Sequence, residues 1–243
     1  MSETTPTSVA LPLPTPRAAL FDVDYTLLRP NEMFRAEGYQ TMGAKFGLAL
    51  DVERWNEAEK AAYAVVKARR TELGPAHDDG VYEAIAGAVI TGMGGGPADV
   101  VQRCAEAVIR EWTRCENFTL YDDVKPCLER LRAAGIGIGL VSNTNRDLGE
   151  VLEHFYLDAF IDAAVTSLDV GFFKPAPQIY LAVLDRLDVS IADAVMIGDS
   201  YEDDVAGAMR CGLAAIMLDR DGRRDLPVPT IRSLAELPAA LSL

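Results

Sequence analysis

Two aspartates, Asp22 and Asp24, directly follow an apolar run near the start of the chain. Side chains two positions apart in an extended segment point to the same side, so both carboxylates can enter one pocket. Two negative charges about 4 Å apart repel each other by roughly 4 kcal/mol at an effective dielectric constant near 20. Such a pair requires a proton, a hydrogen-bond network or a cation. At the carboxyl end of a strand it indicates reaction chemistry rather than architecture.

The first apolar run is also followed by a threonine, Thr26, just after the two aspartates. Three further segments of the chain end in groups that can bind an anion or a metal ion. The segment Ile138–Val141 is followed by Ser142 and Asn143. Farther along the chain come Lys174, immediately before Pro175, and Asp199, immediately after Gly198, with Asp203 and Asp204 in the turn beyond.

Short apolar runs predict the strands that must position these groups. The five runs are Ala18–Phe21, Ile136–Val141, Ala163–Thr166, Ala194–Ile197 and Ala214–Leu218. An amphipathic stretch precedes each of the last four: a helix capped by Asp122 or Asp123 that ends before Gly135, then Arg146–Phe155, Ala176–Leu187 and Glu202–Cys211. This alternation predicts an α/β fold, a Rossmann-like parallel sheet with right-handed crossovers. Functional groups in such sheets lie beyond the carboxyl ends of the strands.

A helical insert interrupts this alternation after the first strand. Residues 30–116 contain about four helical segments and no convincing strand, and their apolar stripes, such as Cys104, Val108 and Trp112, indicate the core of a helical bundle. We therefore predict a core domain from residues 17–29 and 117–243, with a cap domain inserted between them. Residues 1–16 are rich in Thr, Ser and Pro and are expected to form a disordered leader.

The composition excludes several classes of function. The chain has 243 residues, 49% hydrophobic and 25% charged, and its net charge of −14 disfavours nucleic acid as a partner. No apolar run approaches the about 18 residues of a membrane-spanning helix, so no membrane partner is expected. The two histidines do not indicate a triad or a zinc cluster, and the four cysteines have no metal-binding spacing. We expect reduced thiols and a cytoplasmic location.

The four polar segments, in this order and spacing, resemble the four motifs of the haloacid dehalogenase-like superfamily, phosphatase type. The resemblance extends from about Arg17 to Leu218, and the helical insert matches the position and size of that family's small (C1) cap, as in phosphoglycolate phosphatase-like members. The short separation between Asn143 and Lys174 leaves no room for the larger cap of other relatives. One such motif is weak evidence, whereas four in sequence, each ending a strand, are strong.

The resemblance implies a role for each group. Asp22 would be the nucleophile that forms an aspartyl-phosphate, and Asp24 the general acid and base. Mg²⁺ would be held by Asp22, the backbone carbonyl of Asp24, and Asp199. The phosphate oxygens would be bound by Ser142, Asn143 and Lys174, with Thr26 beside them; Asp203 and Asp204 would lie farther out around the metal. Thr26 is also interpretable as a residue that stiffens its loop.

Two positions depart from the family pattern. Tyr25 stands where relatives commonly have glycine after the second aspartate, so the family's loop shape beside the nucleophile does not carry over directly, although no catalytic group is removed. Asp203 stands where many relatives have asparagine, which adds negative charge near the metal. The alternation of Gly135, Gly137 and Gly139 is interpreted as a thin strand packed against a helix rather than a nucleotide-binding loop.

The expected function is a Mg²⁺-dependent phosphomonoesterase for a small phosphorylated metabolite, acting as a monomer or homodimer. A phosphosugar mutase of the same fold is the closest alternative, because it uses the same aspartate pair. A haloacid dehalogenase fits less well, since Asp24 would have no task there. A receiver-like phospho-acceptor module also gathers aspartates and a lysine around Mg²⁺, but its acceptor lies on a later strand of a chain about half this long. The sequence does not identify the substrate.

Overall fold

The computed structural model describes residues 11–224 and 226–243, which form two compact units. One unit contains the described residues up to Leu28 together with those from Leu120 to Leu243, and the other is Arg29–Thr119. The predicted insert, residues 30–116, falls within the second unit. A two-stranded sheet pairs β2 (Leu28–Pro30) with β3 (Phe118–Leu120), the segments where the chain enters and leaves that unit.

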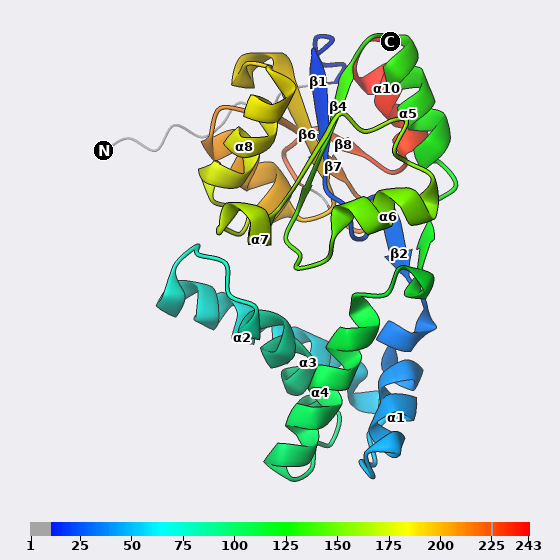
Figure 1. The fold of residues 1–243 in the computed structure, drawn as a ribbon, viewed down its shortest axis with the longest axis vertical. Helices are drawn as coiled ribbons and strands as arrows, with labels where there is room; N and C mark the ends of the chain where they lie inside the picture. Colours follow the sequence, from blue (N-terminus) through cyan, green and yellow to red (C-terminus); the bar gives the residue numbers. More distant parts are fainter. Residues whose placement is uncertain (1–10, 225) are drawn as a thin grey trace. The chain divides into compact units, whose positions relative to one another are not determined.

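The first unit is built on a six-stranded parallel sheet in the order β5-β4-β1-β6-β7-β8 (Figure 1). Its strands are β1 (Ala18–Phe21), β4 (Gly137–Ser142), β5 (Ala163–Thr166), β6 (Ala194–Gly198), β7 (Ala214–Leu218) and β8 (Thr230–Ile231). The five predicted strands are confirmed to within one residue at each end, while the short β8 was not predicted. Strand β1 lies between β4 and β6, so the segment that carries the aspartate pair is central.

Helices cover both faces of this sheet (Figure 1). They are α5 (Val124–Ala133), α6 (Leu148–Phe155), α7 (Ser167–Val170), α8 (Pro177–Leu187), α9 (Gly207–Arg210) and α10 (Leu237–Ala240). On one face, Ile179 and Val183 of α8 join a buried cluster with Leu20 and Met196 of the strands. Helices α5 and α10 contact each other on the opposite face. Alternate strand residues therefore enter two separate cores.

The predicted helix Glu202–Cys211 differs from the structure in its first turn. Residues Tyr201–Ala206 form a π-helical turn, and α9 continues from it. The Val205 N–H bonds the Ser200 carbonyl five residues back, and the Ser200 N–H is accepted by the Asp204 carboxylate at 2.9 Å. A Cβ at Gly198 would lie 2.2 Å from that carboxylate. The wide turn thus directs Asp204 back over the end of β6.

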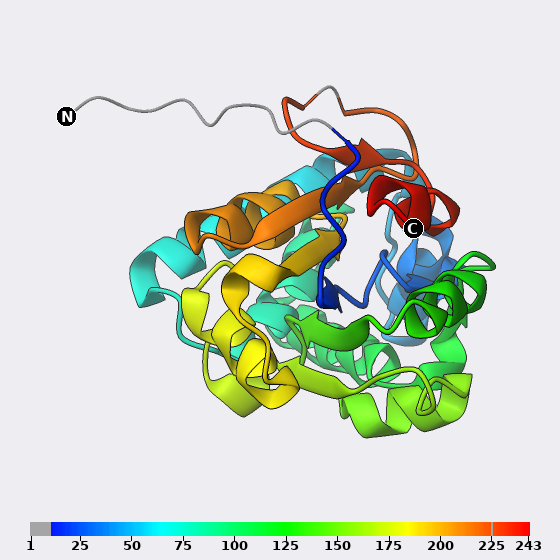
Figure 2. The same cartoon turned by 90° about the horizontal axis from the view of Figure 1, so that it is seen from above.

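The leader predicted over residues 1–16 is ordered over residues 11–16. Its residues 1–10 lie outside the described residues. The Leu13 N–H bonds the Ala240 carbonyl at 2.8 Å, the Thr15 hydroxyl bonds the Leu241 carbonyl at 3.2 Å, and the Leu13 side chain is buried. Figure 2 shows this segment beside the C-terminal helix. Residues 11–16 therefore belong to the packed unit, because backbone hydrogen bonds and Leu13 attach them to the chain end.

The second unit contains four helices, in agreement with the sequence. They are α1 (Ala36–Lys45), α2 (Trp55–Leu73), α3 (Gly80–Gly92) and α4 (Ala98–Trp112). The predicted stripes supply its core: Ala58 and Ala62 of α2 and Cys104 and Val108 of α4 are buried. Short 3₁₀ turns occur in both units, at Glu32–Phe34, Val52–Arg54, Cys115–Asn117, Ile191–Asp193 and Leu234–Glu236.

Two further findings concern membrane-spanning helices and cysteines. Among the described residues, no helix combines the length and apolar character needed to cross a bilayer. Cys104 and Cys127 are buried thiols, and Cys115 and Cys211 are half-buried thiols.

Gly139 lets β4 approach helix α8 closely. A Cβ at this position would lie 2.7 Å from Cγ2 of Val183, 3.0 Å from Cδ2 of Leu20 and 3.1 Å from Cδ1 of Leu187. At Gly137, two residues earlier in the same strand, the nearest atom would be 3.6 Å away, an ordinary contact. The interpretation of a thin strand against a helix is confirmed at Gly139.

We expect Gly139→Ala to lower the free energy of unfolding by about 1–3 kcal/mol, because the added methyl group overpacks the core. Gly137→Ala is the matched control, with an expected change within about 0.5 kcal/mol. Urea denaturation followed by circular dichroism measures both. Equal destabilisation of the two variants would contradict the packing argument.

Candidate active site

The carboxyl ends of three adjacent strands bring the predicted site residues together. Asp22 directly follows β1, Asn143 follows β4, and Asp199 follows β6. Because β1 pairs in parallel with both β4 and β6, these three ends lie at the same edge of the sheet. The apolar strands are buried in the sheet, whereas the polar residues begin where each strand stops.

Three carboxylates meet at this edge. Oxygens of Asp22, Asp199 and Asp204 lie within 4.8 Å of one another. Asp22 and Asp204 are buried, and Asp199 is half-buried. The sequence placed Asp22 and Asp199 at the metal and Asp204 farther out. The structure brings Asp204 into the same group, because the π-helical turn directs its side chain inward.

Lys174 joins two of these carboxylates. Its Nζ lies 2.5 Å from Oδ1 of Asp22 and 2.8 Å from Oδ1 of Asp204, and it donates to the Val141 carbonyl at 2.8 Å. The side chain is only 2% exposed. Burial opposes its charged form, but Asp204 and Asp22 together raise the pKa of Lys174 above its usual value. The ammonium group therefore stays charged: it donates hydrogen bonds to Asp22 and to the Val141 carbonyl, and it forms an ion pair with Asp204.

The carboxylates remain under electrostatic strain in spite of this lysine. Burial raises the pKa of Asp22 well above its usual value, and Lys174 opposes the shift. Burial and the neighbouring Asp204 raise the pKa of Asp199 to about 7. Burial also raises the pKa of Asp204. Each shift reports the cost of gathering negative charge away from water.

This donor set fits a divalent metal ion. Three ionised carboxylates and one ammonium group leave a surplus of negative charge. Carboxylate oxygens in such a cluster are the ligands that Mg²⁺ prefers in proteins. An ion bound there would favour the ionised form of all three acids.

Thr26 and Asn143 hold other site residues. The buried Thr26 hydroxyl donates to Oδ1 of Asp199 at 3.3 Å. The Asn143 amide accepts from the Lys174 N–H at 2.6 Å and donates to the Lys174 carbonyl at 3.0 Å. Its amide nitrogen also lies 3.4 Å from Oδ2 of Asp203. In this structure both side chains therefore orient charged residues of the site.

Ser142 and Asp203 lie at the border of this arrangement. Ser142 is the buried last residue of β4 and pairs with Thr166 of β5. Asp203 faces the Asn143 amide, and its backbone carbonyl accepts a hydrogen bond from the Tyr180 hydroxyl. The carboxylate cluster consists of Asp22, Asp199 and Asp204, and Asp203 is not one of its members.

Tyr25 has the backbone conformation that glycine would adopt most easily. Its φ is 63°, in the left-handed region, and its side chain is exposed. Its N–H bonds the Leu28 carbonyl at 2.6 Å, which closes the loop. The departure from the family pattern therefore keeps the loop but places a strained tyrosine beside Asp24.

Sequence reasoning missed three arginines at this edge of the sheet. Arg146 forms an ion pair with Asp24. Arg220 donates to the Thr26 carbonyl at 2.8 Å, and Arg224 donates to the Asp199 carbonyl at 2.8 Å. No local pattern distinguishes these arginines from solvated ones, because their partners lie far away in the sequence.

Arg220 also corrects the predicted role of Asp123. Asp123 precedes α5, but its side chain does not cap that helix. It accepts two hydrogen bonds from Arg220, at 2.9 and 3.1 Å, and others from the Ser233 hydroxyl and the Leu234 N–H. The hydrogen bonds from Arg220 and Ser233 outweigh partial burial and lower the pKa of Asp123. Arg220 stacks on Tyr121, 3.7 Å from the ring centroid, and thus connects the loop after β1 to the segment before α5.

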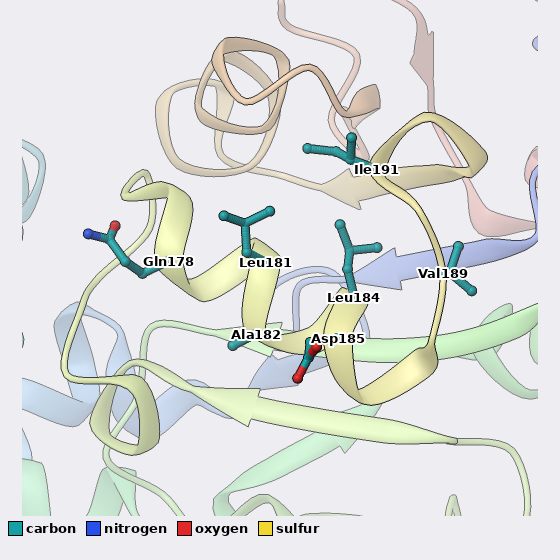
Figure 3. A pocket seen from close by; sticks show the side chains of 7 residues that line it. All are labelled: Gln178, Leu181, Ala182, Leu184, Asp185, Val189 and Ile191. Carbon is teal, nitrogen blue, oxygen red and sulfur yellow. The ribbon is translucent and has the colours of Figure 1, made fainter.

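A separate hollow lies on the outer side of α8 (Figure 3). Its lining is mainly apolar and consists of Gln178, Leu181, Ala182, Leu184, Asp185, Val189 and Ile191. None of the predicted site residues lines it, and it has no cluster of charged groups. The carboxylate cluster is therefore the candidate active site.

Comparison with known proteins agrees with this fold and site. Residues 16–212 match the family model described as haloacid dehalogenase-like hydrolase. A ribulose-1,5-bisphosphate 5-phosphatase of Halopiger xanaduensis is 34% identical over 130 residues, which are 53% of this chain and 54% of that protein. The N-acylneuraminate-9-phosphatase of Mus musculus is 35% identical over 136 residues, with 53% and 54% covered. The chain thus spans about half the length of these curated relatives.

A solved structure extends the likeness to most of the chain. The HAD phosphatase from Thermococcus onnurineus is 27% identical, with a TM-score of 0.62 over 91% of this chain and 96% of that one. The protein belongs to the haloacid dehalogenase-like hydrolase family.

We expect the stability of the metal-free protein to fall as pH rises from about 4 to about 7. The pKa of Asp199 is raised from 3.8 to about 7, so across this interval the folded protein binds more protons than the unfolded chain. Asp199→Asn should remove part of this pH dependence. Adding Mg²⁺ at pH 8 should raise the melting temperature of the wild type by about 5 °C, because the ion binds only the folded protein.

Thermal denaturation in buffers of constant ionic strength measures these effects. Asp158→Asn, at an exposed position, is the matched control and should behave like the wild type. A melting temperature that rises between pH 5 and 7 in the metal-free protein would contradict the assignment. So would a magnesium response that persists unchanged in Asp199→Asn.

Proposed function

We propose that this protein is a Mg²⁺-dependent phosphomonoester hydrolase that acts on a small phosphorylated metabolite. The observation that carries the proposal is the cluster of Asp22, Asp199 and Asp204 with Lys174 at the carboxyl end of β1. Enzymatic phosphoryl transfer depends mainly on positioning and on charge neutralisation, and this cluster can supply both. The phosphatase names of the two relatives and of the Thermococcus onnurineus structure support the same activity.

In the first step, Asp22 is the nucleophile. One of its carboxylate oxygens bonds to phosphorus while the bond between phosphorus and the ester oxygen breaks, which leaves an aspartyl-phosphate. Lys174 orients the Asp22 carboxylate, and with the Ser142 hydroxyl it binds the phosphate oxygens. Thr26 and Asn143 support this binding indirectly. Thr26 holds the Asp199 carboxylate, and Asn143 holds the Lys174 backbone.

Asp24 transfers the protons. It gives a proton to the departing alcohol in the first step. In the second step it takes a proton from the water molecule that attacks phosphorus, which releases inorganic phosphate and restores Asp22. The same group thus serves as acid and then as base.

Asp22, the backbone carbonyl of Asp24, and Asp199 are the groups that would hold Mg²⁺, with Asp204 inside the same cluster. When bound, the ion supplies positive charge to the phosphate oxygens and to the carboxylates. We assign residues 30–116 as the cap domain that selects the substrate.

A phosphosugar mutase remains the second candidate, because it needs the same aspartate pair. Incubation with a bisphosphorylated sugar separates the two, since a mutase yields an isomer and a hydrolase yields free phosphate. A dehalogenase is disfavoured because Asp24, with an arginine of its own, would have no task in halide displacement. A receiver-like module is disfavoured because the acceptor would lie on the first strand of the sheet.

The purified protein should release phosphate from p-nitrophenyl phosphate in the presence of Mg²⁺, and chelation with EDTA should abolish the release. Asp22→Asn should lower kcat by more than about 1000-fold, because it removes the nucleophile. Malachite-green detection measures the phosphate, and Asp158→Asn is the control with wild-type activity. Undiminished turnover in Asp22→Asn would exclude Asp22 as the nucleophile.

Asp24→Asn should form the aspartyl-phosphate from p-nitrophenyl phosphate but hydrolyse it about 100-fold more slowly, because no base activates the water. Acid quenching followed by intact mass spectrometry measures the phosphorylated fraction. Wild-type turnover in this variant, with no phosphorylated protein detected, would refute the acid and base role of Asp24.

A further inference from the structure

Arg146 is a buried arginine in the loop that follows β4. Its side chain is 1% exposed, although it lies only four positions after the end of the strand. The Thr144 hydroxyl accepts hydrogen bonds from the Arg146 backbone N–H at 3.1 Å and from its Nε at 3.4 Å. The Thr144 carbonyl in turn accepts a hydrogen bond from the Ser167 hydroxyl at 3.3 Å. The guanidinium group therefore extends from a loop that is held in place by the hydrogen bonds of Thr144.

The guanidinium group forms an ion pair with Asp24. Nη2 of Arg146 donates to Oδ1 of Asp24, and the Asp24 side chain is 16% exposed. Asp24 is outside the group formed by Asp22, Asp199 and Asp204. The two aspartates of the pair therefore have different cationic partners, Lys174 for Asp22 and Arg146 for Asp24.

Neighbouring features argue against a general structural role for Arg146. A buried charge requires a charged or hydrogen-bonding partner. The adjacent acid in the sequence, Asp147, is exposed, and its carboxylate caps α6 by accepting the Gly149 N–H at 2.7 Å. Arg146 instead reaches an aspartate 122 positions away, the one that follows the nucleophile by two residues.

We propose that Arg146 is a positioning residue for Asp24, an assignment that rests on the proposed phosphohydrolase function. Arg146 fixes Oδ1 of Asp24, so Oδ2 is the oxygen that exchanges a proton with the leaving alcohol and with water. A carboxylate held at one oxygen keeps a constant distance and direction to the ester oxygen, and small misplacements of reacting groups are costly. The planar guanidinium group suits this task because it holds a carboxylate in a defined orientation.

Two aryl esters of similar size test this assignment. Phenyl phosphate has a poor leaving group that requires a proton, whereas p-nitrophenyl phosphate has a leaving group that is stable as an anion. We expect Arg146→Met to lower kcat/KM for phenyl phosphate by about 30-fold or more and for p-nitrophenyl phosphate by less than about 3-fold. In an Asp24→Asn background, Arg146→Met should change neither value by more than about 2-fold, because the group it positions is already absent.

Several measurements keep the test decisive. Thermal denaturation verifies that the variants are folded, and Arg210→Met, which removes an exposed ion pair with Glu202, is the matched control. If Arg146→Met does not fold, Thr144→Val should show the same ester selectivity to a smaller extent, because it removes the support of the guanidinium group. Arg146→Lys should restore part of the phenyl phosphate activity.

The outcomes distinguish a failure of the role of Arg146 from a failure of the proposed phosphohydrolase function. Equal losses with both esters, or an equal loss in the Asp24→Asn background, would overturn the role of Arg146 while leaving the phosphohydrolase intact. If the wild-type protein with Mg²⁺ hydrolyses neither ester, the proposed function fails, and the assignment of Arg146 fails with it.

Discussion

The ion pairs of Lys174 with Asp22 and Asp204 are the interaction on which the rest of this site depends. They join the segments after β1, β5 and β6, which are far apart in the sequence, through one buried ammonium group. Removing a single partner from a buried ion pair leaves an uncompensated charge and is strongly destabilising. The cluster nevertheless retains surplus negative charge, which burial makes costly and a divalent cation would relieve. The same imbalance underlies both the affinity for a metal and the reactivity toward phosphorus that we propose.

The two negative charges of the aspartate pair can lie close together because each one is paired with a different cation. Asp22 forms an ion pair with Lys174 at the carboxyl edge of the sheet. Asp24 forms an ion pair with Arg146, which lies in the loop after β4. In the mechanism that we propose, different partners allow two chemically identical side chains to take different roles, one as the nucleophile at phosphorus and one in proton transfer. A pair that shared one cation would not be differentiated in this way.

Neutral and peripheral groups keep these charged groups in place. Asn143 makes two hydrogen bonds to the Lys174 backbone, Thr26 bonds Asp199, and Arg220 bonds the Thr26 carbonyl. The π-helical turn carries Asp204 over Gly198, where no Cβ obstructs it. Polar residues around the site thus serve mainly to orient charged ones, and this preorganisation is what electrostatic catalysis requires.

The amino-acid sequence alone determined the α/β fold, the five main strands and the placement of Asp22 and Asp199 at the carboxyl ends of two of them. These features could be predicted because buried strands are short apolar runs, and polar groups at their carboxyl ends must share one edge of a parallel sheet. The tertiary structure alone decided that Asp204 rather than Asp203 joins the cluster, that Asn143 and Thr26 orient other residues, and that Arg146 pairs with Asp24. Those outcomes depend on which side chains from distant segments come within a few ångströms of one another. Local patterns do not encode that distance, because it arises only when the strands, helices and turns have packed.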